Sequence, residues 1–366
     1  MCYNKRMSPE QMSKNDPVNI LKNYRDRVWP EIESYLTNPE YPKQFVIPPK
    51  FRSVDEFHWD AVKDYPERKG KYLRPTLLVL TYEALGGKIE TALKTAAAMQ
   101  VSEDWLLIHD DLEDESLERR GKPTLHLIYG SNVAINAGDA LQIIMWKILN
   151  DNYQVLDKNV ANELANEFYR ILSRTALGQN AEAKWTKENL LDMSDYDWFF
   201  IADGKTAYYT IAGPMRLGAI LAGASEDQLD RITEFGLNLG RCFQIVDDVL
   251  DLTSDFGGLK KQTGNDIYEG KRTLMLGHLL RSTDGKDRER LIAILAKPRD
   301  KKTQEEVDWV ITAMNEAGSI KHARTIATEL KNRALEIFDN DLSFLSTEPA
   351  RSHLKTLINF VLERDR

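Results

Sequence analysis

Two short acidic clusters contain the residues of this chain best suited to chemistry. They are Asp-Asp-Leu-Glu-Asp at 110–114 and Asp-Asp-Val-Leu-Asp at 247–251. In each cluster the first and last aspartates are four residues apart, so on a helix their carboxylates share one face about 6 Å apart along the axis. Unpaired like charges at this spacing destabilise a helix. The residues just before each cluster are apolar, and we therefore expect both clusters at the edge of a buried cavity.

Carboxylates in such a place need positive charge, and a hard divalent cation supplies it. Mg²⁺ typically takes one or two carboxylates together with phosphate oxygens of a substrate. For a single cluster, a solvated helix face is an equally good interpretation. Two clusters, each followed by a basic loop that contains glycine, favour the metal site. The candidate ligands are Asp110, Asp111, Asp114, Asp247, Asp248 and Asp251.

Basic residues with an affinity for phosphate accompany the two clusters. Arginine offers bidentate contacts to phosphate oxygens and lysine a compact point charge. Each of these residues alone is better explained as a surface charge, and only their combination indicates a site for phosphates. The candidates are Lys71, Arg74, Arg119, Arg120, Lys205, Lys261 and Lys271.

The elements that must hold these residues are helices. Apolar residues recur at spacings of three or four from Leu229 to Leu250, and no convincing alternating strand or short repeat is present. The pattern predicts an all-α fold, a bundle of about a dozen helices around a central active-site cavity. Expected helices cover residues 18–36, 91–112, 134–149, 161–183, 198–221 and 320–338.

Breaks between these helices are short. Prolines between 39 and 49 indicate an extended connection, and polar loops are expected at 115–124 and 254–268. No break has the length of an interdomain linker, so we expect one domain over 16–366, preceded by a disordered stretch at 1–15.

Composition excludes several classes of protein. The 366 residues are 42% hydrophobic and 29% charged, with a net charge of −8, which argues against a general nucleic-acid binder. No apolar run is long enough to cross a bilayer, and no apolar signal core is present at the N-terminus. Cys2 and Cys242 are the only cysteines, which excludes a disulfide framework and fits a cytoplasmic location.

From about Asp64 to Lys271 the chain resembles the trans-isoprenyl diphosphate synthase (polyprenyl synthetase) family. The segments that carry the resemblance begin with Gly-Lys-Tyr-Leu-Arg-Pro at 70–75, His-Asp-Asp-Leu-Glu-Asp at 109–114 and Arg-Arg-Gly-Lys-Pro-Thr-Leu-His at 119–126. They continue with Gly-Asp-Ala-Leu at 138–141, Lys-Thr-Ala at 205–207, the segment 243–251 and the segment 261–273.

The resemblance implies a role for each matching residue. Asp110, Asp114 and Asp247 would ligate three Mg²⁺ ions, with Asp111, Asp248 and Asp251 as direct or water-mediated helpers. Arg119, Lys205, Lys261 and Lys271 would contact an allylic diphosphate, and Lys71, Arg74 and Arg120 would bind isopentenyl diphosphate. Thr206 and Gln244 would face the allylic cation. A homodimer is expected on the resemblance alone.

Two residues depart from the family pattern. Glu103, seven before Asp110, stands where the family usually carries His or Gln against isopentenyl diphosphate. We expect Glu103 to pair with a cation such as Lys71 or Arg74; the alternative is an altered second-substrate site. Glu182 replaces the family's usual Asp.

Other features of the pattern bear on structure and product. His109 and His126 are expected to make structural hydrogen bonds only, because metal ligation is not needed among so many oxygen ligands. Trp105, five residues before Asp110, is the candidate floor that limits product length. Leu106 beside it is not aromatic, which favours a twenty-carbon product over a fifteen-carbon one; ordinary core packing of Trp105 is the alternative.

Two other functions are considered beside the synthase. A terpene cyclase would not normally need the Lys71 and Arg74 site or the second acidic cluster, and a regulatory subunit usually loses one cluster. Glu103 is the feature that keeps both open.

Overall fold

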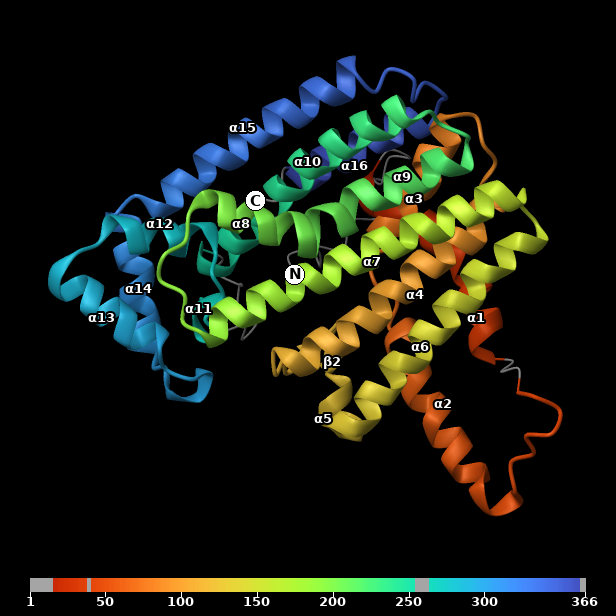
Figure 1. Ribbon diagram of the computed structural model, residues 1–366, viewed down its shortest axis with the longest axis horizontal. Helices are drawn as coiled ribbons and strands as arrows, with labels where there is room; N and C mark the ends of the chain where they lie inside the picture. The colour runs from red at the N-terminus through yellow and green to blue at the C-terminus, as the bar shows by residue number, and fades with distance from the viewer. Residues whose placement is uncertain (1–15, 38–40, 254–262, 363–366) are drawn as a thin grey trace.

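The computed structural model is helical, as the periodicity of the sequence predicts (Figure 1). It describes residues 16–37, 41–253 and 263–362. The predicted all-α class is confirmed. The expectation of disorder at 1–15 lies outside the described residues. The elements of the first half are α1 (Pro17–Thr37), η2 (Pro49–Phe51), α2 (Arg52–Glu67), α3 (Leu73–Ala84), α4 (Ile89–Glu113), β1 (Glu118–Arg119), β2 (Lys122–Pro123), α5 (Leu125–Tyr129), α6 (Ser131–Asp151), η3 (Asn152–Gln154) and α7 (Lys158–Lys187).

The second half continues the bundle. Its elements are α8 (Asp195–Ala202), η4 (Asp203–Ala212), α9 (Gly213–Leu221), α10 (Glu226–Thr253), α11 (Asn265–Glu269), α12 (Leu274–Ser282), α13 (Gly285–Leu295), η5 (Arg299–Lys301), α14 (Gln304–Glu316), α15 (Ser319–Asn340) and α16 (Ala350–Leu362). Local sequence sets several of the helix starts: Ser194 with Asp197 and Thr303 with Glu306 form capping boxes at α8 and α14.

The bundle packs long helices side by side. Figure 1 shows α10 running along α15 on one side of the molecule and α4 beside α6 on the other, and both pairs are in contact. Buried apolar residues form one cluster that extends from Ile20 on α1 to Leu362 on α16. Among the described residues, no helix has both the length and the apolar character needed to span a membrane.

Three details differ from the sequence prediction. The described part of the loop predicted at 254–268 contains the short helix α11. The stretch 198–221, predicted as one helix, consists of α8, the π-helix η4 and α9, because a wider turn is inserted in its middle. The loop predicted at 115–124 contains a hairpin in which β1 pairs antiparallel with β2. Each strand has two residues, which is too short for an alternating pattern to be recognised in the sequence.

Candidate active site

The first acidic cluster lies at the C-terminal end of α4 and faces two lysines from distant elements. Asp110 Oδ1 lies 3.5 Å from Lys205 Nζ and accepts a hydrogen bond from Gln179 Nε2 at 3.3 Å. Asp114, which caps α4, accepts a hydrogen bond from Lys271 Nζ at 3.1 Å. The fold thus places two of the lysines expected to contact the allylic diphosphate beside the first cluster.

Asp111 is oriented differently from its two neighbours. It is fully buried, and its Oδ2 accepts a hydrogen bond of 2.6 Å from the Tyr65 hydroxyl. Arg119 donates to the same carboxylate, through Nε at 2.9 Å and Nη2 at 2.5 Å. Asp111 thus holds an arginine, and a role as a direct metal ligand would need both contacts to be rearranged.

The second acidic cluster lies near the C-terminal end of α10. Asp247 is half-buried on this helix, and Asp248 is buried and accepts a hydrogen bond from Gln244 Nε2 at 2.7 Å. Asp251 Oδ2 accepts a hydrogen bond of 3.0 Å from the backbone N–H of Asp266. The short helix α11 is therefore attached directly to the second cluster.

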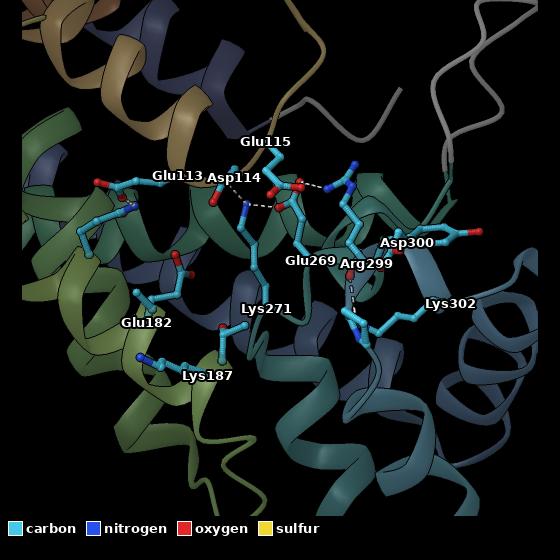
Figure 2. A pocket seen from close by; sticks show the side chains of 15 residues that line it. Glu113, Asp114, Glu115, Glu182, Lys187, Glu269, Lys271, Arg299, Asp300 and Lys302 are labelled. Carbon is cyan, nitrogen blue, oxygen red and sulfur yellow. Dashed lines mark hydrogen bonds and ion pairs between the residues drawn. The ribbon is translucent and has the colours of Figure 1, made fainter. Parts of the chain in front are cut away.

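Two lysines lie between the carboxylates of several elements. Lys205 on η4 contacts Glu182 at 2.6 Å, and Lys271 contacts Glu269 at 2.6 Å. Figure 2 shows Lys271 between Asp114 and Glu269, with Glu269 in turn bound by Arg299 at 2.8 Å. The cavity beside Lys271 has a volume of about 860 Å³. It is lined by Glu113, Asp114, Glu115, Gln179, Glu182, Ala183, Thr186, Lys187, Tyr268, Glu269, Lys271, Pro298, Arg299, Asp300 and Lys302.

Burial and mutual repulsion govern the charge of these carboxylates. Burial raises the pKa of Asp114 to about 6 against the attraction of Lys271, and burial with the neighbouring Asp251 raises the pKa of Asp266 to about 7. Burial also opposes ionisation of Asp110, but Lys205 and Lys271 outweigh it and lower the pKa of Asp110. Added positive charge would therefore favour the ionised forms of Asp114 and Asp266.

A second group of charged residues surrounds Glu103. Arg74 Nη1 lies 3.1 Å from Glu103 Oε1, and Arg120 Nη2 lies 3.8 Å from the same oxygen. The predicted pairing of Glu103 with a neighbouring cation is confirmed for Arg74. Arg120 also pairs at 2.9 Å with Asp104, whose pKa burial raises to about 6 despite the attraction of Arg120. The two arginines predicted to bind isopentenyl diphosphate therefore already face two carboxylates.

Two further basic candidates complete the account. Lys71 is exposed at the start of the main body, three residues before Arg74. Lys261 lies outside the described residues.

Lys205 and Thr206 belong to the π-helix η4. This segment lies so close to α7 that a Cβ on Gly178 would be 2.5 Å from the backbone nitrogen of Lys205 and 2.8 Å from the carbonyl carbon of Gly204. π-helical turns are rare and occur frequently at functional sites, because the added residue redirects side chains. Here the turn and the contact at Gly178 set the position of Lys205.

Trp105 and His109 share one face of α4. Trp105 is half-buried, its Nε1 donates to His109 Nδ1 at 3.3 Å, and His109 Nε2 lies 3.3 Å from the Ile135 carbonyl oxygen on α6. The structural role predicted for His109 is confirmed. Four residues turn a helix by about 40° and five by about 140°, so Leu106 lies nearer than Trp105 to the face of Asp110. His126 lies 3.5 Å from Thr124 Oγ1.

Several residues of the site were not among the sequence candidates. Asp266 and Glu269 lie inside the segment 261–273 that carries the resemblance, so their carboxylates were a usable signal. No sequence signal indicated Tyr65, Asp104 or Arg299, because only the packing of the fold determines their partners.

The donor set fits a hard divalent cation. Among the described residues, no three acidic, histidine or cysteine side chains come close enough to bind an ion by themselves. Mg²⁺ usually completes its octahedron with water and substrate phosphate oxygens, so two separate acidic clusters suit ions that a diphosphate also ligates. The residues available for this are Asp110 and Asp114 on α4 with Asp247 and Asp251 on α10.

Comparisons with known proteins agree with this geometry. A family model described as polyprenyl synthetase matches residues 57–314. The chain is similar to a short chain isoprenyl diphosphate synthase of Methanothermobacter thermautotrophicus, with 33% identity over 81% of this chain and 87% of that protein. It is 32% identical to a geranylgeranyl diphosphate synthase of Saccharolobus solfataricus, over 81% of this chain and 86% of that one. The crystal structure of geranylgeranyl pyrophosphate synthetase from Pyrococcus horikoshii covers 94% of this chain and 98% of its own, with a TM-score of 0.79 and 27% identity.

Proposed function

Because the chain belongs to the polyprenyl synthetase family, we propose that it is a prenyltransferase that joins isopentenyl diphosphate to an allylic diphosphate in a head-to-tail (1′–4) condensation. One observation carries the proposal: carboxylates of α4 lie beside Lys205 and Lys271, and Lys271 also contacts Asp266 of α11. Two diphosphates cannot approach each other closely without several cations, and this region supplies both lysines and donors for metal ions.

The metal ions belong to the proposal as a set of three Mg²⁺. Asp110, Asp114 and Asp247 would hold them together with the allylic diphosphate, and Asp251 would assist directly or through a water molecule. When bound, Mg²⁺ acts as a Lewis acid that stabilises the leaving diphosphate. We assign Asp111 and Asp248 to supporting roles, since both side chains are buried.

Residues of the chain would bind the two substrates and stabilise the allylic cation. Arg119, Lys205 and Lys271, with Lys261, would bind the allylic diphosphate, and Lys71, Arg74 and Arg120 would bind isopentenyl diphosphate. As the allylic carbon–oxygen bond breaks, the oxygens of Thr206 and Gln244 would stabilise positive charge at the carbon. The double bond of isopentenyl diphosphate attacks that carbon, and the departing diphosphate accepts the proton that is released. Exclusion of water protects the cation in between.

We further propose that the product is the twenty-carbon all-trans geranylgeranyl diphosphate. Trp105, five residues before Asp110 and followed by the non-aromatic Leu106, supports a twenty-carbon product. The similarity to a protein named geranylgeranyl diphosphate synthase supports the same product. Farnesyl diphosphate is the alternative product. The proposal treats residues 16–366 as one catalytic domain, because the apolar cluster joins α1 to α16.

The proposed enzyme is cytoplasmic and homodimeric. The small number of cysteines supports a reducing compartment. An exposed apolar surface on α5 and α6 supports a second copy as the partner, since monomers rarely leave such residues uncovered. The exposed residues are Leu127, Ile128, Ile135, Ile143 and Trp146.

Incubation of the purified protein with Mg²⁺, isopentenyl diphosphate and dimethylallyl, geranyl or farnesyl diphosphate tests the proposal. Elongated prenyl diphosphates that disappear with EDTA are expected, and their length identifies the product. Asp251→Asn should remove this activity. Asp230→Asn, on the exposed N-terminal part of the same helix, should not.

Glu103 makes two other outcomes informative. Hydrocarbon or alcohol formed from the allylic substrate alone would favour a terpene-cyclase-like reaction, in which Glu103 marks a lost isopentenyl diphosphate site. No reaction with any substrate would favour a regulatory homologue.

A further inference from the structure

Tyr65 lies beneath the hairpin that carries two predicted diphosphate-binding arginines. It is in the last turn of α2, and its side chain is fully buried. Its hydroxyl donates to Asp111 Oδ2 at 2.6 Å, and Asp111 accepts from Arg119 at 2.5 to 3.1 Å. The three side chains form a continuous chain of hydrogen bonds from α2 to Arg119.

The backbone of Tyr65 engages the other arginine. Its carbonyl oxygen accepts a hydrogen bond from Arg120 Nη1 at 2.9 Å. Arg68, one turn further along, places its guanidinium 4.6 Å from the Tyr65 ring and donates to the Arg119 carbonyl at 2.8 Å and the Pro123 carbonyl at 2.8 Å. The end of α2 therefore fixes both the hairpin backbone and the side chains that it presents.

The hydroxyl and the carbonyl of Tyr65 serve different arginines. Hydrogen bonds that involve a charged group are stronger than neutral ones, and a buried carboxylate that loses a donor moves to find another. Asp111 has no exposed surface on which water could replace the hydroxyl. Burial and the neighbouring Asp111 raise the pKa of Tyr65, so the hydroxyl stays a neutral donor at ordinary pH.

We propose that Tyr65 is a positioning residue whose hydroxyl, acting through Asp111, orients Arg119 for the allylic diphosphate. The inference rests on the proposed function and adds to it a residue outside both acidic clusters. Within the described part of the chain, the hydrogen bonds of the Arg119 guanidinium to Asp111 use Nε and Nη2, which leaves Nη1 for the substrate. Loss of the hydroxyl should weaken binding of the allylic diphosphate and leave isopentenyl diphosphate, bound through Arg120, almost unaffected.

Tyr65→Phe tests the proposal because it removes only the hydroxyl. The expected result is a rise in KM for the allylic diphosphate of about tenfold, with KM for isopentenyl diphosphate changed by less than about twofold. Tyr24→Phe is the matched control: the Tyr24 hydroxyl donates to Glu83 at 2.5 Å, Tyr24 is also buried, and its loss should change neither KM. In an Asp111→Asn background, Tyr65→Phe should cause little further change, since both act on Arg119.

Calorimetric titration with inorganic pyrophosphate and Mg²⁺ supplies a readout that needs no turnover. Tyr65→Phe should weaken pyrophosphate binding and Tyr24→Phe should not. Equal rises in both KM values, or a lower melting temperature with unchanged KM and unchanged pyrophosphate affinity, would overturn the positioning role.

If the unaltered protein binds pyrophosphate but does not elongate prenyl chains, the proposed function fails, and the pyrophosphate comparison still decides the role of Tyr65. If Tyr65→Phe does not fold, Asp111→Asn alone must produce the selective loss of allylic affinity.

Discussion

At the scale of single residues, the site balances few cations against many carboxylates. Lys271 contacts Asp114 at 3.1 Å, Glu269 at 2.6 Å and Asp266 at 3.9 Å. These partners raise the pKa of Lys271 despite its burial, so the ammonium stays charged. In the proposed reaction, a diphosphate bound with metal ions would offer Lys271 new anionic oxygens, and the ions would neutralise the carboxylates. The same lysine can therefore be satisfied before and after binding.

Glu103 competes with a diphosphate for the same arginines. It lies 3.1 Å from Arg74 and 3.8 Å from Arg120. Replacement by the neutral glutamine or histidine removes this competing charge from Arg74, while Arg120 keeps its contact with Asp104. We expect Glu103→His to keep or improve the affinity for isopentenyl diphosphate, with KM lowered by about threefold to tenfold. Steady-state kinetics at saturating allylic diphosphate measures this, and a large rise in KM would show that Glu103 helps to bind the substrate.

Product length is predicted to respond to Trp105. Trp105→Ala should lengthen the main product by at least one five-carbon unit if the indole is the floor of the cavity. Leu106→Ala is the informative comparison, because helical geometry puts Leu106 nearer the face of Asp110. Products resolved by chain length decide between the two. A profile unchanged by Trp105→Ala rejects the floor, and the hydrogen bond from Trp105 to His109 would then be its main role.

At the scale of elements, the contact between α7 and η4 positions Lys205. Gly178 allows the two backbones to meet, and η4 carries both Lys205 and Thr206. Small residues serve α10 in the same way, since Gly240 packs against Ala207 and Gly236 against Ala212. The π-helical segment is therefore held from two sides by backbones that approach closely.

Gly178→Ala should separate α7 from η4. Alanine normally favours a helix over glycine by about 1 kcal/mol, but overpacking against backbone atoms costs about 1–3 kcal/mol. We expect a net loss of free energy of unfolding together with a fall in kcat, because Lys205 moves. Gly277→Ala is the control: its nearest neighbour is the flexible end of Met193, and its effect should be smaller. Denaturant unfolding and kcat, measured on both variants, test this; an active and more stable Gly178→Ala protein would contradict the argument.

At the scale of the whole molecule, the exposed apolar residues are not spread evenly. Leu127 and Ile128 on α5 and Ile135, Ile143 and Trp146 on α6 are all exposed, although α6 also packs closely against α4. One face of α6 thus packs against α4, the helix that carries the first acidic cluster, and another face is exposed in the single chain. A second copy bound there would stabilise the helix layer that carries the first acidic cluster.

Ile143→Asp tests the dimer. Ile143 is 70% exposed, so the change should leave the fold of one chain intact while it places a charge in the proposed interface. Light scattering should give a mass near twice the 42.0 kDa of one chain for the unaltered protein and a lower mass for the variant. Tyr196→Asp, at an 84% exposed position on α8, should leave the mass unchanged. A monomeric unaltered protein would reject the interface.

The sequence alone determined the features that depend on short-range spacing. Aspartates four residues apart and apolar residues at three or four predict both the helices and the carboxylate rows on them. The order of the motifs indicated the family and the basic residues that accompany the clusters. It also singled out Glu103, for which the fold supplies Arg74, one of the two expected partners, and adds Arg120.

Only the tertiary structure decided which charged groups meet. Lys271 and Asp114 are 157 residues apart, and Tyr65 and Asp111 are 46 apart, so no periodicity links them. Asp111 and Asp114 belong to one cluster, yet one faces Tyr65 and Arg119 and the other faces Lys271. The sequence also did not predict the π-helical turn at Lys205, because apolar spacing does not distinguish such a turn from an α-helix. Such choices depend on how packed helices orient each side chain, and only the folded chain fixes that orientation.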